Sequence, residues 1–221
     1  MNQKQLLENF LRMYPKTFTE EEKELILNYA YSGQFMPADV REIYDELGVL
    51  PKELNIYEGF FDLLKRNFQI RDKRVIEVGG GVLPRLAKRI DSVIGSGEIV
   101  VYDPRLSTYE SDTSSLKLIR REFTSQISLK NCDLLVALMP DDVVDFLINK
   151  AIKNNVDFMI GLGFGGGHGD DFDFYEDANE WAHAVICSAE DAVKNNGMGK
   201  LKVKTMEEYG NPCPIIYNKR G

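Results

Sequence analysis

The spacing of apolar residues divides this chain into two parts. Over residues 1–70, apolar side chains recur at intervals of three and four, which is typical of amphipathic helices. Proline, serine and glycine residues interrupt the stripes and predict where the helices end. Thr19 and Glu22 have the spacing of a capping box, which predicts the start of the second helix. From residue 71 onward, short apolar runs alternate with helical stripes, a pattern that favours a parallel sheet flanked by helices. We therefore expect a helical segment over 1–70 and an α/β domain over 71–221.

Apolar runs in the second part predict the individual strands. The runs expected to form parallel strands are 74–78, 98–103, 116–120, 132–140 and 156–160. Two later runs, 201–204 and 214–217, predict a closing antiparallel hairpin. The helix after the first run is expected to end near Ile94, and Pro140 is expected to start the helix after the fourth run, with Asp141 and Asp142 in its first turn. Charged and apolar residues alternate in the third run, which indicates a strand at the edge of the sheet. The order of these strands and helices is evidence for the fold in addition to any single motif.

The first of these runs leads into the clearest candidate chemistry, Glu77-Val78-Gly79-Gly80-Gly81. A strand, a tight glycine turn and a helix in this order direct the free N–H groups of the helix N-terminus toward a ligand. Glu77 lies in a strand that should be apolar on both faces, and a buried acid costs free energy unless it has a partner. The dinucleotide fingerprint G-x-G-x-x-G fits only in part, because Pro84 occupies the place of the third glycine.

Written as E-x-G-x-G, the same stretch resembles the first motif of class I S-adenosylmethionine-dependent methyltransferases. The resemblance covers residues 71–221 and implies the Rossmann-like fold of that family. This is an α/β fold with a seven-stranded, mostly parallel sheet and a closing antiparallel hairpin, preceded here by an N-terminal helical segment that serves as a cap or lid. The resemblance also implies S-adenosylmethionine as the cofactor, with the glycine turn passing its amino acid moiety.

Further cofactor contacts follow from the ends of the second and fourth runs. Asp103 follows Gly81 at close to the spacing of about 20 residues at which an acid after the second strand binds ribose hydroxyls. The alternative is that Asp103 only caps the turn at Pro104. The end of the fourth run resembles the family's fourth strand, which lines the cofactor and the acceptor. The predicted cofactor-binding residues are Glu77, Gly79, Gly80, Gly81, Asp103, Pro104, Leu138 and Met139. Glu122 and Phe123, after the third run, are candidates for the adenine end.

His168 is the candidate catalytic base. It follows the fifth run, at the side of the sheet where ligands bind in open α/β folds, and an unperturbed imidazole titrates near neutrality. The alternative is an exposed loop histidine without a catalytic role. We expect the acceptor to lie between the ends of the fourth and fifth strands and the helical segment. The residues expected around it are Met139, Pro140, Phe164 and His168 on one side and Tyr31, Phe35 and Tyr57 on the other.

Acidic residues after the fourth and fifth runs raise the alternative of a metal site. Their placement is similar to that of the magnesium ligands in catechol-type O-methyltransferases. They are Asp141, Asp142, Asp170 and Asp171. Acids are also common in first helical turns and polar loops, so we expect no metal ion. The cysteines are few and lack metal-ligand spacing, which indicates reduced thiols.

Composition narrows the partner and the compartment. Apolar residues make up 43% of the chain and charged residues 28%, with a net charge of −8. Because nucleic acid phosphates would be repelled by this charge, we expect a small-molecule acceptor rather than nucleic acid. No apolar run is long enough to span a bilayer and no signal-peptide pattern is evident, so we expect a cytoplasmic protein without a membrane partner. The sequence leaves the acceptor and the oligomeric state open.

Three alternative functions use the same glycine turn. Residues 79–84 are also similar to the glycine–Leu–Pro turn of nicotianamine-synthase-like enzymes, which transfer the aminocarboxypropyl group of the same cofactor. A second alternative is a non-enzymatic protein with a methyltransferase-like fold that binds the cofactor or joins a complex. A nicotinamide oxidoreductase is the third, but Glu77 and the closing hairpin argue against it.

Overall fold

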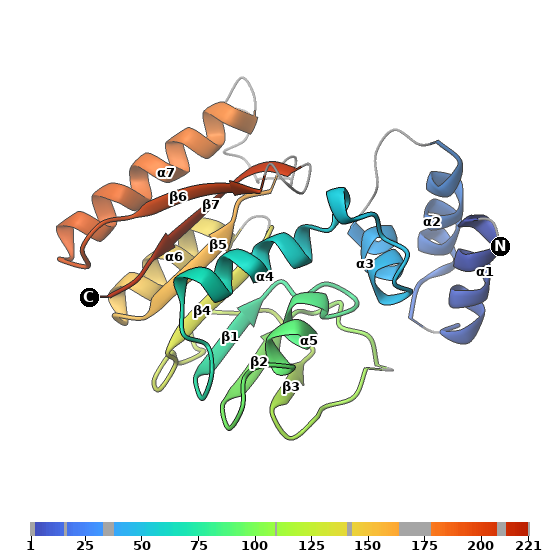
Figure 1. The fold of residues 1–221 in the computed structure, drawn as a ribbon, viewed down its shortest axis with the longest axis horizontal. Coiled ribbons are helices and arrows are strands. Elements are labelled where there is room, and N and C mark those ends of the chain that lie inside the picture. The colour runs from blue at the N-terminus through green and yellow to red at the C-terminus, as the bar shows by residue number, and fades with distance from the viewer. Residues whose placement is uncertain are drawn as a thin grey trace.

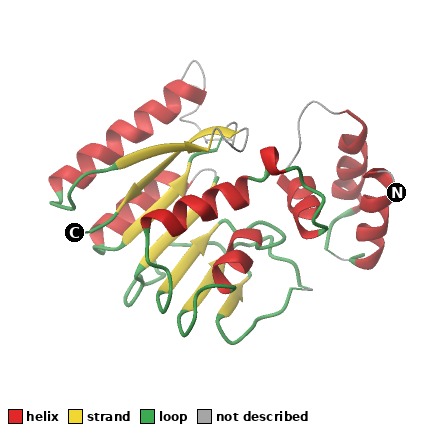
Figure 2. Ribbon diagram, in the orientation of Figure 1, coloured by secondary structure: helices red, strands yellow, loops and turns green. Residues whose placement is uncertain are grey.

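The computed structural model describes residues 3–15, 17–32, 38–108, 110–140, 143–163, 178–206 and 211–220. Within them, the strands form a seven-stranded sheet with helices on both faces (Figure 1; Figure 2). The strands are β1 (Arg74–Val78), β2 (Glu98–Tyr102), β3 (Leu116–Ile119), β4 (Leu134–Leu138), β5 (Asp157–Gly161), β6 (Lys202–Met206) and β7 (Asn211–Asn218). The helices are α1 (Gln3–Met13), α2 (Glu20–Ser32), α3 (Ala38–Glu46), η1 (Lys52–Leu54), α4 (Ile56–Asn67), α5 (Arg85–Asp91), α6 (Val144–Lys153) and α7 (Ala178–Asn195).

The strand order is β3-β2-β1-β4-β5-β7-β6. Strands β1 to β5 are parallel, while β7 runs antiparallel to both β5 and β6. The predicted mostly parallel sheet with its closing hairpin is confirmed, and so is the edge position of β3. The order reverses between β1 and β4, and ligands of open α/β sheets bind outside the carboxyl ends of the strands at such a point. The glycine turn follows β1 at this same place.

Alternate side chains of the central strands enter two separate cores. On one face, Ile76 and Leu135 pack with α6 and α7. On the other face, Val75 and Val136 pack with α4 and α5. Because the central strands are buried on both sides, their sequences are continuously apolar, as expected in a parallel sheet. Burial of each such side chain contributes about 1.5–3 kcal/mol.

Helices α1 to α3 form a third core beyond the end of the sheet (Figure 1). Leu7 and Ile43 are fully buried in it, together with Val82 and Leu83 from the segment between the glycine turn and α5. The same hydrophobic cluster therefore contains the first helices and the turn. Helix α4 belongs instead to the core of the sheet, since Phe60 packs among the residues that cover β1 and β4.

An ion cluster joins α3 to α5. Asp45, whose side chain is 4% exposed, accepts from Arg85 Nε at 2.7 Å and from Arg89 Nη2 at 2.6 Å. Asn55 Nδ2 also donates to Asp45 at 2.8 Å, and Glu58 of α4 accepts from Arg89 Nε at 3.0 Å. Burial alone would raise the pKa of Asp45, but the hydrogen bonds from Arg89 and Arg85 outweigh it and lower the pKa. The cluster fixes α3 beside the first turn of α5.

The predicted start of the second helix is confirmed by a capping box. The N–H of Glu22 donates to Thr19 Oγ1 at 3.2 Å, and the N–H of Thr19 donates to Glu22 Oε2 at 2.8 Å. These reciprocal bonds satisfy two N–H groups that the helix cannot pair internally. Helix α2 then ends at Ser32, as its Ser-Gly boundary predicts.

Two helix boundaries differ from the sequence prediction. Helix α5 ends at Asp91 rather than near Ile94, whose carbonyl accepts from Asp72 and Gly97 instead of continuing the helix. Helix α6 begins at Val144, so Pro140 precedes the helix and is not its first residue. The acid in its first turn is Asp145, whereas Asp141 and Asp142 lie outside the described residues.

Candidate functional site

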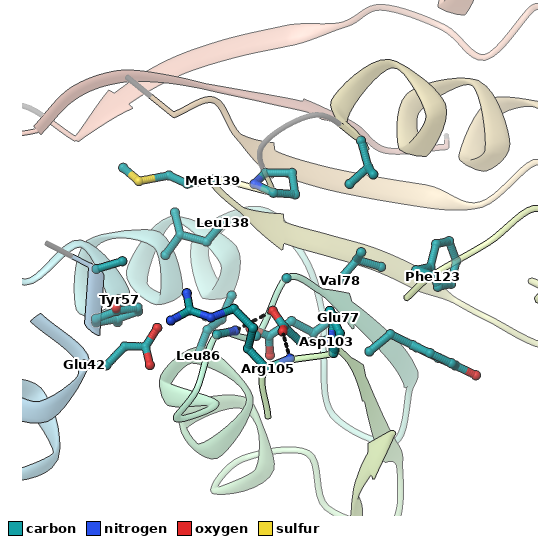
Figure 3. Close-up of a pocket in the computed structure, with 18 of the residues that line it drawn as sticks. Glu42, Tyr57, Glu77, Val78, Leu86, Asp103, Arg105, Phe123, Leu138 and Met139 are labelled. Atoms are coloured by element: carbon teal, nitrogen blue, oxygen red, sulfur yellow. Dashed lines mark hydrogen bonds between the residues drawn. The ribbon is translucent and has the colours of Figure 1, made fainter. Parts of the chain in front are cut away.

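A cavity of about 400 Å³ lies at the carboxyl ends of β1, β2 and β4 (Figure 3). This volume is within the range of about 300–1,000 Å³ that small-molecule sites occupy. Its walls come from the glycine turn, the segments after β2 and β4, and helices α3 and α4. In Figure 3, Phe123 lies at one end of the cavity, while Glu42 and Tyr57 lie at the other.

The glycine turn forms one wall. Gly79 and Gly81 have φ values of 79° and 72°, a left-handed conformation that glycine adopts without steric cost. A Cβ atom at Gly80 would overlap with Val101 of β2, and one at Gly81 would overlap with the carboxylate of Glu42. The absence of side chains here lets other groups, including a ligand, approach the backbone closely.

Asp103 follows β2 and holds the glycine turn. Its Oδ2 accepts the N–H of Gly81 at 2.9 Å, and its Oδ1 accepts the N–H of Arg105 at 2.7 Å. The second bond is the local cap around Pro104 that the sequence left open, while the first reaches back across 22 residues. Asp103 is 9% exposed, and burial raises its pKa. A carboxylate has about four acceptor sites, so two remain for ligand hydroxyls.

Glu77 is the buried acid of β1 and is 2% exposed. Burial, followed by the charge of Asp103, raises its pKa to about 8, although a hydrogen bond with the backbone of Ala87 opposes the rise. Within the described part of the chain, its Oε2 atom has no hydrogen-bond partner. A buried carboxyl group short of a partner favours a nearby cation or hydrogen-bond donor. Glu77 lines the cavity, where a ligand could supply either.

The end of β4 supplies the wall beside the glycine turn. Leu138, Met139 and Pro140 line the cavity, and a Cβ atom at Gly79 would lie 3.4 Å from Pro140 Cα. Met139 has a φ of 55°, which costs a residue with a side chain about 1–2 kcal/mol. Strain of this kind persists where the surroundings impose it, and it often accompanies functional sites.

The end of the cavity at Phe123 is aromatic. Tyr102 and Phe123 pack edge to face, with ring centroids 5.3 Å apart, and both line the cavity beside Glu122. Phe123 is 6% exposed. Both adenine candidates from the sequence therefore reach the cavity wall. Flat aromatic edges and faces of this kind suit a planar heterocycle.

Helix α3 contributes residues that sequence reasoning missed. Arg41 and Glu42 both line the cavity. Glu42 is 5% exposed and its Oε2 accepts the N–H of Leu83 at 2.8 Å. Burial, with a smaller contribution from the charges of Asp39 and Asp103, raises its pKa well above the usual value. In the sequence, Glu42 is an ordinary acid beside an apolar stripe, so no signal marked it.

Two further side chains connect the helices to the cavity. Tyr57 of α4, expected from the sequence to reach in, does line it, and burial together with the charge of Glu42 raises its pKa well above the usual value. Arg105, which the sequence did not single out, donates from Nη2 to Asp39 Oδ2 of α3 at 2.8 Å. It thereby joins the segment after β2 to the first helices.

All of the predicted cofactor-binding residues line this one cavity. They are Glu77, Gly79, Gly80, Gly81, Asp103, Pro104, Leu138 and Met139. Other predicted residues lie outside the described part of the chain. They are the candidate base His168, with Phe35, Asp141, Asp142, Phe164, Asp170 and Asp171, and the side chain of Tyr31. Among the residues that are described, no three His, Cys, Asp or Glu side chains are placed to hold a metal ion.

Solved structures share this architecture. An S-adenosylmethionine-dependent methyltransferase from Aquifex aeolicus is similar at 14% identity over 84% of this chain and 98% of its own, with a TM-score of 0.51. The fold is that of the class I methyltransferases. A chain from the complex between the Haloferax volcanii Trm112 methyltransferase activator and the putative methyltransferase is also similar, at 11% identity over 82% of this chain and 98% of its own, with a TM-score of 0.51.

A longer human protein is similar over part of its length. Human N-acetylserotonin methyltransferase, solved in complex with S-adenosylmethionine, is 14% identical over 84% of this chain, with a TM-score of 0.46. The present chain spans 61% of the length of that human protein. No protein-family model matches the sequence, and no curated protein matches it. None of the helices in the described ranges is both long enough and apolar enough to cross a membrane.

Proposed function

We propose that this protein is an S-adenosylmethionine-dependent methyltransferase. The observation that carries the proposal is the meeting of Asp103, Glu77 and the glycine turn around one cavity at the switch point of a methyltransferase fold. The residues present fit the cofactor. The buried Oε2 of Glu77 has no hydrogen-bond partner among the described residues, and a cationic ligand would stabilise its negative charge. The cavity volume is also sufficient for a ligand of this class.

Each part of the cofactor has a candidate partner in the chain. Asp103 accepts the ribose hydroxyls with the lone pairs that its bonds to the backbone leave free. The aromatic end at Tyr102 and Phe123 receives the adenine. The glycine turn borders the amino acid end, and Glu77 compensates the positive charge of the sulfonium. Acidic side chains outnumber cations along the cavity, which suits a cofactor with a net positive charge.

When bound, the cofactor supplies an activated methyl group for direct displacement. The chain's task is then to align the acceptor atom and exclude water. Leu138, Met139 and Pro140 form the apolar side of the acceptor space, and Tyr57 closes it from α4. His168 is the proposed base for an acceptor that must lose a proton as it reacts. We propose a small-molecule acceptor, in keeping with the net charge of −8 and a cavity partly closed by helices.

Within the helical segment of residues 1–70, helices α1 to α3 are proposed to act as a cap on the α/β domain of residues 71–221, while α4 packs in the core of the sheet. Helix α3 reaches the cavity through Glu42 and is held to α5 by Asp45. A ligand in the cavity would therefore contact α3 directly. A cap that contacts the ligand also keeps water from the reaction.

Calorimetry with the whole chain tests the cofactor. S-adenosylmethionine and S-adenosylhomocysteine should bind, and NAD should not. Asp103→Ala should weaken binding by about 1.5–3 kcal/mol, the cost of a lost hydrogen bond to a charged group. Asp112→Ala is the matched control, because Asp112 also accepts a backbone N–H, that of Leu118 at 2.9 Å, but does not line the cavity. Equal binding by Asp103→Ala, or preference of the native protein for NAD, would overturn the proposal.

The spent cofactor identifies the group that moves. Methyl transfer leaves S-adenosylhomocysteine, whereas aminocarboxypropyl transfer leaves methylthioadenosine. One observation favours aminocarboxypropyl transfer as the alternative. It is the Leu83-Pro84 sequence that follows the glycine turn and leads directly into α5. Chromatography of reactions with pools of candidate acceptors should show S-adenosylhomocysteine. Methylthioadenosine would indicate aminocarboxypropyl transfer, and binding without either product would indicate a non-enzymatic binder.

A further inference from the structure

Glu42 places a carboxylate from the N-terminal helices directly on the glycine turn. Its Oε2 accepts the N–H of Leu83 at 2.8 Å, and its Oε1 occupies the space that a side chain at Gly81 would need. Glu42 is 5% exposed and lines the cavity. Figure 3 shows its carboxylate beside Tyr57, at the opposite end of the cavity from Phe123. An acid from outside the α/β domain is thus part of the proposed cofactor site.

The surroundings of Glu42 leave its charge poorly compensated. Burial and the nearby acids Asp39 and Asp103 disfavour the carboxylate, while Arg105 and the Leu83 N–H favour it. The balance raises the pKa of Glu42 well above its usual value. Removing a carboxylate from water is costly unless a cation or further donors reach it. A cationic ligand group at this end of the cavity would meet that demand.

The position of Glu42 along the cavity indicates which cationic group of the ligand it would meet. If adenine lies at the aromatic end and the ribose at Asp103, the amino acid end of the cofactor extends toward Glu42 along the glycine turn. That end carries an α-ammonium and a carboxylate. Arg41, the neighbour of Glu42 on α3, lines the same cavity and has the charge that suits the carboxylate.

We propose that Glu42 binds the α-ammonium of S-adenosylmethionine, so that α3 is part of the cofactor site and not only a cover over it. The inference rests on the proposed function, because it assumes this cofactor. It gives the helical cap a contact that exists only when the cofactor is bound. Cofactor binding then holds α3 against the glycine turn through the ligand itself.

A purely structural role is the competing explanation. In that case the bond to Leu83 tethers α3 to the turn, and Glu42 affects every ligand equally through the shape of the cavity. The substitution Glu42→Gln separates the two roles. A glutamine amide oxygen still accepts the Leu83 N–H, but the side chain loses the negative charge that an ammonium group requires.

The test is calorimetry of the whole chain with three ligands. S-adenosylhomocysteine carries the α-ammonium, its desamino analogue lacks only that group, and methylthioadenosine lacks the whole amino acid end. Glu42→Gln should weaken S-adenosylhomocysteine about tenfold or more, as expected for a lost charge-assisted hydrogen bond. Its affinity for the other two ligands should stay within about twofold of the native protein, the scale of a change below 0.5 kcal/mol.

Controls and contrary outcomes are distinct. Glu46→Gln, at the end of α3, removes an acid that pairs with Arg85 and Lys88 outside the cavity, and it should bind all three ligands as the native protein does. Equal weakening of all three ligands by Glu42→Gln, or of none, would overturn the inference while leaving the proposed function intact. Failure of the native protein to bind any of them would overturn the proposed function itself. If Glu42→Gln does not fold, Glu42→Asp retains the charge but withdraws it by one methylene, and it should show the same ligand selectivity in weaker form.

Discussion

The carboxylate of Asp103 accepts the backbone N–H of Gly81 across 2.9 Å, and this bond joins the end of β2 to the turn after β1. One residue therefore belongs both to the cavity wall and to the support of the glycine turn. The same turn is contacted from the other side by Glu42 of α3. Acids from two distant parts of the chain thus hold the segment along which a ligand would lie.

The turn geometry predicts a specific cost for a side chain at Gly81. Gly81→Ala should destabilise the protein by about 1–3 kcal/mol beyond the cost of the left-handed backbone, because the new Cβ overlaps with the Glu42 carboxylate. Gly48→Ala is the matched control, since Gly48 has a φ of 67° and nothing within 4 Å of its added Cβ. Chemical denaturation of both variants measures the difference.

A second variant shows whether the overlap is the cause. In the double variant Gly81→Ala/Glu42→Ala, removal of the carboxylate should recover part of the stability lost in Gly81→Ala. Additive effects of the two substitutions would contradict the steric explanation, as would equal costs at Gly81 and Gly48.

Glu77 should trade stability against cofactor binding in a pH-dependent way. Its pKa is about 8 in the folded protein against 4.5 for the free side chain, so the folded state holds the proton more tightly. The stability from this group is fully present below pH 4.5 and is lost as the pH rises through about 8. Glu77→Gln cannot ionise, so its melting temperature should exceed that of the native protein increasingly between about pH 5 and pH 9.

The same variant should bind S-adenosylmethionine more weakly at neutral pH, because the proposed partner of its positive charge is gone. Glu98→Gln provides the opposite case at the start of the neighbouring strand β2. A hydrogen bond from Lys117 is the largest cause of the lowered pKa of Glu98. The substitution Glu98→Gln should therefore not stabilise the protein at high pH. A Glu77→Gln protein that is less stable than the native one at about pH 9 would show that the buried charge is compensated.

The ion cluster around Asp45 should matter more than any surface pair. Asp45→Asn leaves Arg85 and Arg89 without their buried counter-charge and should cost about 3 kcal/mol at neutral pH. The value is at the lower end for buried pairs, because the two arginine side chains are 12% and 17% exposed. Asp62→Asn, which breaks a pair with the exposed Lys65, should cost less than about 1 kcal/mol.

The sign of the pH dependence follows from the lowered pKa of Asp45. Its contribution to stability is present above the unfolded value of 3.8 and is lost as the pH falls through the lower folded value. The difference in unfolding free energy between native protein and Asp45→Asn should therefore be constant near neutrality and shrink in acid. A constant difference down to the acid limit would contradict the assignment of the charge.

Much of the fold was predictable because it depends on local order and periodicity. The apolar runs around Val75 and Val136 could be recognised as strands buried on both faces, since such strands have no polar side. The left-handed backbone at Gly79 and Gly81 follows from residue type, because glycine alone adopts it without cost. Glu77 could be singled out because an acid in such a strand contradicts its surroundings.

The pairing of distant side chains depended on tertiary structure. Nothing in the spacing of residues on α3 distinguishes Glu42, which meets the glycine turn, from Glu46, which pairs with Lys88. Asp103 was expected at a ligand, but its bond to Gly81 depends on the parallel register of β1 with β2. A sequence pattern reports which face of an element is apolar, whereas contacts between elements depend on how whole helices and strands pack. The chain alone therefore determined the strands and the turn, and packing decided which acids surround it.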